Sequence, residues 1–156
     1  EGELLVAGAN VFSGYWRAAE KTAESFAVDA SGTRWFRTGD LARRDPASGH
    51  VTLLGRRTEL ILCGGYNVYP REIEELLESH PAILEAAVVG RPHPEWGEVP
   101  VAYVVARAAF AEDDLIAWCW GEFASFKAPR AVRAVDSLPR NALGKVQKHL
   151  LPREPV

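Results

Sequence analysis

A glycine and a lysine near the end of the chain have the residue types needed to bind a phosphate group. They lie in the run Leu138-Pro139-Arg140-Asn141-Ala142-Leu143-Gly144-Lys145. Gly144 has no side chain to obstruct a close backbone approach. Lys145, at a place where a helix could begin, adds a mobile point charge. In such a pair taken alone, the lysine is more often an ordinary solvated side chain than a phosphate ligand. The other motifs must decide between these two interpretations.

A carboxylate that could hold a sugar follows a strand-like run, Trp35-Phe36-Arg37-Thr38-Gly39-Asp40. Gly39 permits a sharp turn, and we expect Asp40 to project from the end of the strand. A carboxylate placed in this way can accept hydrogen bonds from both hydroxyls of a ribose. The alternative is that Asp40 only caps a turn.

Two further features could contact a thin or planar ligand. Gly64 and Gly65 would let the backbone approach such a ligand closely, although a simple hairpin turn explains them equally well. Trp96 lies in the run Gly90-Arg91-Pro92-His93-Pro94-Glu95-Trp96-Gly97-Glu98. It could be a partly exposed stacking platform for a purine, or it could pack in the core.

The elements that must position these residues change in character near Thr58. Residues 1–55 are predicted to form short strands and turns, with one short helix at about 18–26. Such a segment could hardly bury a full core alone. From Thr58 onward, strands alternate with helices, so we place a domain boundary at residues 56–58.

The second part is predicted to contain a buried strand at 60–63, a short return at 67–69 and strands at 84–89, 99–105 and 132–135. Pro70 suits the first turn of a helix, whose apolar stripe holds Ile73, Leu76 and Leu77. Asp113 or Asp114 could cap a second helix, whose apolar face holds Leu115, Ile116, Cys119 and Phe123. A last helix is expected to end near Leu151. The prediction is an α+β fold, with a small three-stranded sheet and packed helices after a β-rich segment.

Composition narrows the classes of function. The chain has 156 residues, 47% of them hydrophobic, and a net charge of −3, which gives no general attraction to nucleic acid. It contains no apolar run long enough to span a membrane. Cys63 and Cys119 are isolated, which argues against a zinc site or a disulfide framework and fits a reducing cytoplasm. Because the chain starts without Met, directly in a strand-like run, we expect a piece of a longer protein.

The motifs taken in order resemble the adenylate-forming superfamily, which comprises acyl- and aryl-CoA synthetases, luciferases and the adenylation domains of peptide synthetases. The resemblance spans essentially the whole chain. It rests on four runs: Phe36-Arg37-Thr38-Gly39-Asp40, Gly55-Arg56-Arg57-Thr58-Glu59-Leu60-Ile61, Gly64-Gly65-Tyr66-Asn67-Val68-Tyr69-Pro70-Arg71-Glu72-Ile73-Glu74 and Pro139-Arg140-Asn141-Ala142-Leu143-Gly144-Lys145-Val146. The nearest similarity is to CoA ligases of the malonyl-CoA synthetase and aryl-CoA ligase kind.

This resemblance implies a role for each matching residue. Asp40 corresponds to the aspartate that holds the ribose hydroxyls of ATP, and Arg56 to an arginine near the same ribose and phosphate. Lys145 corresponds to the catalytic lysine of adenylation, and Thr58 to the hinge about which the C-terminal domain swings. The residues that the resemblance assigns to CoA are Gly64, Gly65, Trp96, Phe126, Lys127 and Arg130.

The resemblance also implies the organisation and the chemistry. Residues 1–55 would be the last β-rich part of an N-terminal adenylation domain, residues 56–58 the hinge, and residues 59–156 the C-terminal lid domain. In this family a carboxylic acid attacks ATP, with Mg²⁺ shielding the phosphates, and the resulting acyl-AMP passes its acyl group to CoA.

The sequence departs from the family pattern at three places. Thr58 stands where Asp or Lys is frequent, and Ala128 stands where some relatives have a basic residue. The Ser/Thr/Gly-rich phosphate loop is absent, because Ser31-Gly32-Thr33 is too short to replace it. The acid pocket is also missing, so the chain alone is expected to be inactive, to need an N-terminal domain as partner, and to bind ATP or CoA weakly at most.

We therefore expect the C-terminal portion of a cytoplasmic acid–CoA ligase that acts on a small carboxylic acid, ATP and CoA. One alternative within the superfamily is an adenylation domain that feeds a carrier-protein thiol. Another, of a different class, is a free-standing module that binds a nucleotide or CoA without chemistry. We expect no nucleic-acid partner and no membrane span.

Overall fold

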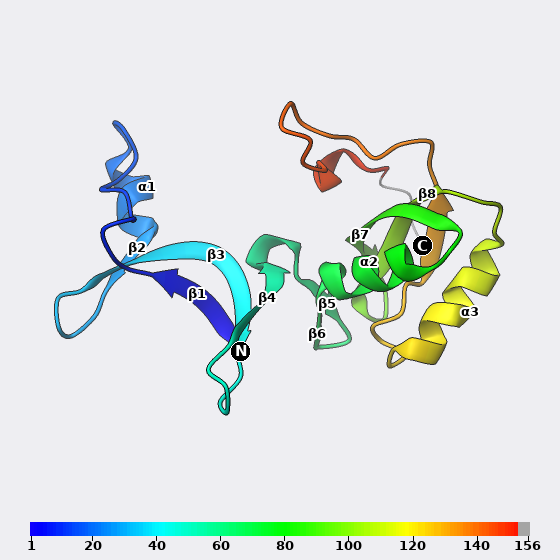
Figure 1. Cartoon of the computed structure of the whole chain (residues 1–156), viewed down its shortest axis with the longest axis horizontal. Helices are drawn as coiled ribbons and strands as arrows, with labels where there is room; N and C mark the ends of the chain where they lie inside the picture. Colours follow the sequence, from blue (N-terminus) through cyan, green and yellow to red (C-terminus); the bar gives the residue numbers. More distant parts are fainter. Residues whose placement is uncertain (153–156) are drawn as a thin grey trace. The chain divides into compact units, whose positions relative to one another are not determined.

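The structure is a computed structural model that describes residues 1–152 of the chain (Figure 1). The chain divides into two compact units, residues 1–58 and residues 59 onward.

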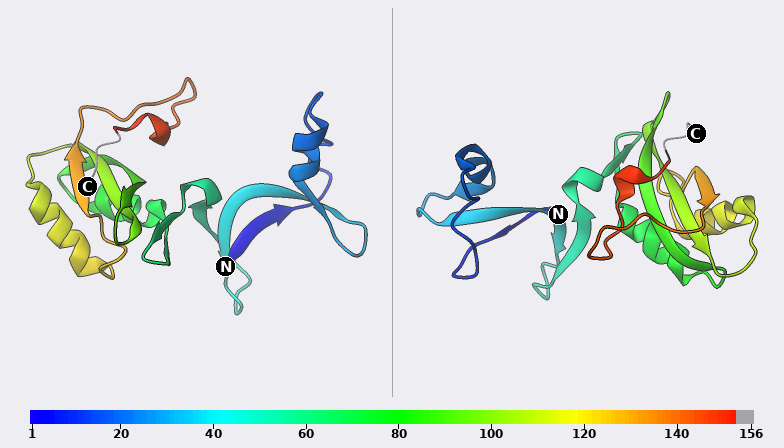
Figure 2. Two further views of the ribbon diagram at one scale, coloured as in Figure 1. Left: turned by 180° about the vertical axis from the view of Figure 1, so that it is seen from behind. Right: turned by 90° about the horizontal axis from the view of Figure 1, so that it is seen from above.

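The first unit is a four-stranded antiparallel sheet built around one long strand (Figure 2). The central strand β3 pairs with each of the other three strands. The elements are β1 (Gly2–Val6), α1 (Ala19–Glu24), β2 (Phe26–Val28), β3 (Arg34–Arg44) and β4 (Val51–Arg56). The short helix predicted at about 18–26 is therefore confirmed.

The first unit buries little of its apolar surface. Among its described residues, only Ala42 and Leu54 are buried hydrophobic side chains. Phe12 instead gathers a partly exposed aromatic cluster, with ring centroids 5.0–5.6 Å from Tyr15, Phe26 and Phe36. This agrees with the expectation that the segment cannot build a complete core.

The second unit is a mixed sheet with helices, and it confirms the predicted α+β class. Its elements are η1 (Arg57–Glu59, which begins in the first unit), β5 (Ile61–Cys63), β6 (Tyr66–Val68), α2 (Pro70–Ser79), β7 (Ile83–His93), β8 (Gly97–Ala106), α3 (Glu112–Glu122), β9 (Ala131–Ala134) and η2 (Lys148–Leu150). The sheet order is β6-β5-β8-β7, and β9 pairs in parallel with β8. The sheet has five strands where we predicted three, because the β5–β6 hairpin joins β8 through the pair Cys63 and Gly97.

The two faces of this sheet carry two separate cores. On one face, Ile73 and Leu77 of α2 and Leu115 and Cys119 of α3 pack on strand residues such as Val104. The intervening strand residues face the other side, where Leu138 and Leu151 of the C-terminal segment cover Ala87, Val101 and Tyr103. Burial on both faces explains why β7 and β8 read as nearly continuous apolar runs.

Two predicted helix features are wrong. Helix α3 begins one residue before Asp113, with Ala111 at the N-cap, so Asp113 and Asp114 lie inside the first turn. Their charges still suit the positive end of the helix dipole there. The predicted last helix is only the single 3₁₀ turn η2, which is followed by extended backbone at Leu151.

Candidate functional site

Asp40 and Arg56 form an ion pair on neighbouring strands. They face each other in the β3–β4 register, and Arg56 Nε lies 2.9 Å from Asp40 Oδ1. Arg56 also donates to the Thr38 carbonyl at 2.7 Å. Asp40 lies within β3 rather than at its end, where we had expected it, because β3 continues to Arg44. The pair presents a carboxylate and a guanidinium side by side, a combination able to bind hydroxyl and phosphate groups.

Gly64 and Gly65 form the two-residue turn of the β5–β6 hairpin. Their φ angles are +57° and +84°, and two positive values are typical of the tight turns that fit the twist of a hairpin. The Gly64 N–H donates to the Trp96 carbonyl at 2.8 Å. A Cβ atom at Gly64 would lie 2.7 Å from the Trp96 ring. The hairpin is thus confirmed, and the absence of a side chain at Gly64 is what lets Trp96 lie against the turn.

Trp96 is both a core residue and a partly exposed one. It packs against the core beneath α2 and α3, while the Arg130 guanidinium lies 5.2 Å from its ring centroid. Arg130 also lies 5.6 Å from the ring of Trp120, which is 48% exposed. Sequence reasoning missed Trp120, because nothing in the sequence of α3 indicates that this tryptophan lies beside Arg130.

Phe126 contacts a residue of β6, and Lys127 contacts a residue of α2. The Phe126 ring is stacked on Tyr66, with centroids 4.3 Å apart and an interplanar angle of 19°. Lys127 Nζ lies 2.8 Å from Glu72 Oε2, so its charge is already paired. Ala128 is fully buried, which explains why no basic side chain stands there. Sequence reasoning also missed Tyr66, although its position directly after the Gly64-Gly65 turn could have suggested it.

Lys145 lies just after the tip of a short, closely hydrogen-bonded loop and not at the start of a helix. Asn141 Oδ1 accepts hydrogen bonds from the N–H groups of Leu143 and Lys145, at 3.0 and 2.9 Å. Gly144 has a φ angle of +80°, and its N–H donates to the Asn141 carbonyl at 2.9 Å. The expectation of a helix start is therefore wrong, because the Asn141 side chain closes a turn in its place.

The charge of Lys145 is available to a ligand. Within the described part of the chain, its ammonium group has neither an ion-pair nor a hydrogen-bond partner, and the residue is exposed. The basic residues on either side are occupied. Arg140 pairs with Glu85 at 2.9 Å, and Lys148 pairs with Glu59 and Glu74. Among the described residues, Lys145 is thus an unpaired cation near the tip of a loop whose neighbouring cations Arg140 and Lys148 are bound.

The candidate residues divide between the two units. Asp40 and Arg56 belong to the first, and Thr58 is its last residue. The second unit brings together Gly64, Trp96 and Arg130, and it carries Phe126, Lys127 and Lys145 as well. The hinge role of Thr58 stays a prediction, as do the ligand roles of the other residues.

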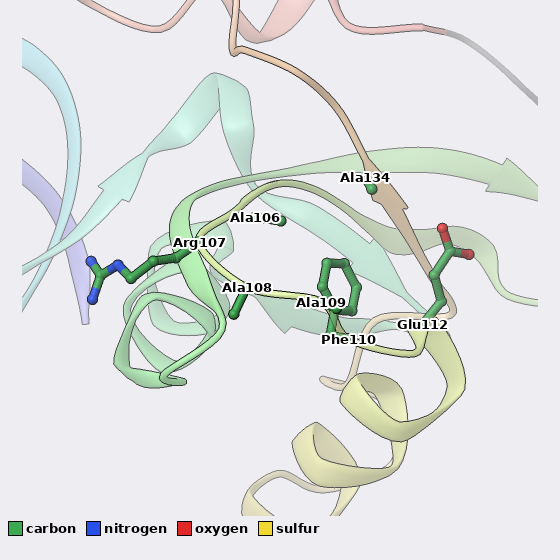
Figure 3. A pocket seen from close by; sticks show the side chains of 7 residues that line it. All are labelled: Ala106, Arg107, Ala108, Ala109, Phe110, Glu112 and Ala134. Atoms are coloured by element: carbon green, nitrogen blue, oxygen red, sulfur yellow. The ribbon is translucent and has the colours of Figure 1, made fainter.

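A surface pocket of about 470 Å³ lies where β8 leads into α3 (Figure 3). Alanines make up most of its lining, with Phe110 and Glu112 at one side, while the Arg107 side chain points away from both. Glu112 is paired with Arg133 at 3.4 Å. The pocket includes none of the candidate residues, and we assign no role to it.

The described residues carry neither a cluster of metal-binding side chains nor a membrane-spanning helix. Residues 1–152 contain no group of three or more His, Cys, Asp or Glu side chains that could hold a metal ion. None of the helices described here is long and apolar enough to cross a membrane.

Known proteins resemble the chain in both sequence and structure. The model of the AMP-binding enzyme C-terminal domain matches residues 72–145. A 3-[(3aS,4S,7aS)-7a-methyl-1,5-dioxo-octahydro-1H-inden-4-yl]propanoyl:CoA ligase of Rhodococcus jostii is 46% identical over 99% of this chain and 29% of its own length. A 2-succinylbenzoate–CoA ligase of Bacillus cytotoxicus is 45% identical over 99% of this chain and 30% of its own.

The solved structure of o-succinylbenzoate CoA synthetase from Bacillus subtilis, in complex with its acyl-adenylate intermediate, superimposes with a TM-score of 0.88 at 39% identity. It covers 96% of this chain and 30% of that protein. The chain therefore spans about 30% of the length of the relatives that it matches. Residues 72–145 match the AMP-binding enzyme C-terminal domain, and nearly the whole chain is similar in sequence and structure to CoA ligases.

Proposed function

We propose that this chain forms the C-terminal part of an AMP-forming acid–CoA ligase. The complete enzyme would activate a carboxylic acid with ATP, releasing pyrophosphate, and would transfer the acyl group from acyl-AMP to CoA. The chain alone would be inactive, because the phosphate loop and the acid pocket are not among its residues. Named relatives of this chain are CoA ligases, which supports the proposal. A cytoplasmic location agrees with its two buried, free thiols.

The observation that carries the proposal is the ammonium of Lys145, which lies near the tip of its loop and has no partner among residues 1–152. During adenylation the α-phosphate gains negative charge in the transition state, and a cation placed beside it stabilises that charge. Asp40 would accept hydrogen bonds from the ribose hydroxyls, while Arg56 would lie near the ribose and phosphate. Mg²⁺ would shield the negative charges of the ATP phosphates.

A second surface would serve the transfer to CoA. The Gly64-Gly65 turn would border the pantetheine arm, because its backbone can approach a thin chain closely. Trp96 and Phe126 would contact the CoA nucleotide through their rings. Arg130 and Lys127 would lie near its phosphates, although Lys127 would first have to leave Glu72. Thr58 would be the hinge that presents one surface and then the other.

The two half-reactions test this division of roles in the full-length enzyme. Replacing Lys145 by alanine should slow adenylation by about 10²–10³-fold, the usual loss for one electrostatic contact to a transition state. Thioester formation from preformed acyl-AMP and CoA should keep the wild-type rate. Lys21→Ala, which removes an exposed lysine of the first unit, is the matched control. An equal loss in both half-reactions would refute the proposed roles.

Calorimetric titration of the 156-residue chain gives an independent test. With most ligand contacts missing, ATP and CoA should each bind weakly or not measurably. Tight binding of ATP to this chain alone would contradict its assignment as one part of a larger site, and would favour a free-standing nucleotide-binding module.

A further inference from the structure

We propose that Lys148 is a positioning residue that holds the loop of Lys145 in place through Glu59 and Glu74. This inference rests on the proposed role of Lys145 in adenylation. No part of the resemblance assigned a role to any of these three residues. They are called the Lys148 clamp below.

The clamp joins three segments that are distant in sequence. Lys148 Nζ lies 2.9 Å from Glu59 Oε2 and 2.7 Å from Glu74 Oε1. The side chains of Lys148 and Glu74 are only 19% and 16% exposed. Solvent therefore screens these pairs less than it screens an ordinary surface pair.

The carboxylate at the centre of the clamp is itself fixed. Glu74 projects from α2, and its Oε1 also accepts a hydrogen bond from the Val88 N–H of β7 at 2.7 Å. Glu74 therefore ties the ammonium of Lys148 to both a helix and a strand of the second unit. Glu59, the other partner, is the first residue after Thr58 and lies in η1.

Lys148 lies three residues beyond Lys145, on the C-terminal side of the loop. The N-terminal side is held by Arg140, which pairs with Glu85 at 2.9 Å. The two sides are joined at the base, where the Gln147 N–H donates to the Pro139 carbonyl at 2.7 Å. The loop thus has one ion-paired residue on each side and, near its tip, the ammonium of Lys145, which has no partner within the described part of the chain.

Beyond Lys148 the segment is held again, at Leu151 and Pro152. Leu151 is buried, and the Pro152 carbonyl accepts hydrogen bonds from Arg91 and Tyr103, at 2.6 and 2.5 Å. Because this attachment persists without Lys148, loss of the clamp should loosen the loop locally and leave the fold intact.

The consequence for catalysis follows from geometry. A charge that stabilises a transition state must lie at a defined place, and a displacement of about 1 Å can cost about 10²-fold in rate. Lys148 itself, with its ammonium bound by two carboxylates, would not contact the substrate. Its loss should therefore lower kcat for adenylation, while the KM for CoA in the second half-reaction stays unchanged.

The experiment replaces Lys148 by methionine in the full-length enzyme. Adenylation should fall by about 10- to 100-fold, with thioester formation from preformed acyl-AMP unchanged. Lys148→Arg, which keeps the charge, should restore most of the rate. Hydrogen exchange measured by mass spectrometry should become faster in the peptide that spans residues 141–147 and stay the same in β7 and β8. Arg71→Met, which breaks the exposed pair with Glu75, is the matched control and should change neither quantity.

The outcomes separate this inference from the proposed function. If Lys145→Ala slows adenylation by about 10²–10³-fold while folded Lys148→Met adenylates at the wild-type rate, the positioning role is refuted and the proposed function stands. If Lys145→Ala adenylates normally, the proposed function fails and the inference fails with it. Should Lys148→Met not fold, Glu59→Gln removes only one of the two carboxylate charges. A slower adenylation in that folded variant supports the clamp, and a wild-type rate overturns it.

Discussion

Replacing Gly64 by alanine should destabilise the second unit more than the same change at Gly65. Both residues have positive φ angles, +57° and +84°, so alanine at either position incurs a backbone penalty of about 1–2 kcal/mol. The surroundings differ. A Cβ at Gly64 would lie 2.7 Å from the Trp96 ring, whereas a Cβ at Gly65 has no atom within 4 Å.

The difference between the two variants measures the contact with Trp96. The indole cannot move freely, because its ring packs on the core and its carbonyl accepts the Gly64 N–H. Forcing it aside is an overpacking change that costs about 1–3 kcal/mol. We therefore expect a loss of about 2–5 kcal/mol for Gly64→Ala and about 1–2 kcal/mol for Gly65→Ala.

Urea unfolding of the full chain, followed by far-UV circular dichroism, measures both losses without relying on tryptophan fluorescence. A double-mutant cycle sharpens the test. In a Trp96→Ala background the extra loss at Gly64 should disappear, leaving only the backbone penalty. Equal losses for the two glycine variants, or a Gly64→Ala loss that persists without the indole, would refute this reasoning.

Two further predictions concern the core beneath α2 and α3. Leu77→Ala should lower the free energy of unfolding by about 2–5 kcal/mol, because Leu77 is fully buried; Leu76→Ala, at a partly buried position, should cost less in the same urea experiment. Burial raises the pKa of the Cys119 thiol to about 11 from the ordinary 9.0. The folded state therefore holds its proton more tightly than the unfolded state, so this contribution to stability is complete below about pH 9 and declines as the pH rises towards 11. The free energy of unfolding should decline less over this pH range in Cys119→Ala. An identical pH dependence in both proteins would contradict the attribution of the decline to the Cys119 thiol.

Much of the second unit could be predicted from the sequence, because its strands are buried on both faces. The apolar runs at 60–63, 84–89, 99–105 and 132–135 fall on β5, β7, β8 and β9, although β7 continues four residues beyond its predicted end and β8 begins two residues before its predicted start. Helix α2 begins at Pro70, as the missing N–H of proline suggested. Local sequence patterns of this kind indicate which strands and helices form.

Contacts between distant residues could not be predicted in the same way. Periodicity does not reveal that Tyr66 stacks on Phe126, or that Lys148 reaches Glu59 across 89 positions. The loop of Lys145 was missed for a different reason. Asn141 binds two backbone N–H groups with one side-chain oxygen, and these local hydrogen bonds replace the helix start that we expected at Lys145. The asparagine three residues before Gly144 was the available signal.

The β7–β8 hairpin has a consequence for the order of folding. Its strands are close in sequence and pair from Ile83 and Ala106 to His93 and Gly97, so closing it costs little chain entropy. The parallel pairing of β9 with β8 joins Val101 to Ala131 and must close a much longer loop. We therefore expect the hairpin, with Trp96 in its turn, to form in the transition state, and the segment that carries Lys145 to dock afterwards. Substitutions in that segment should then raise the unfolding rate and leave the folding rate almost unchanged.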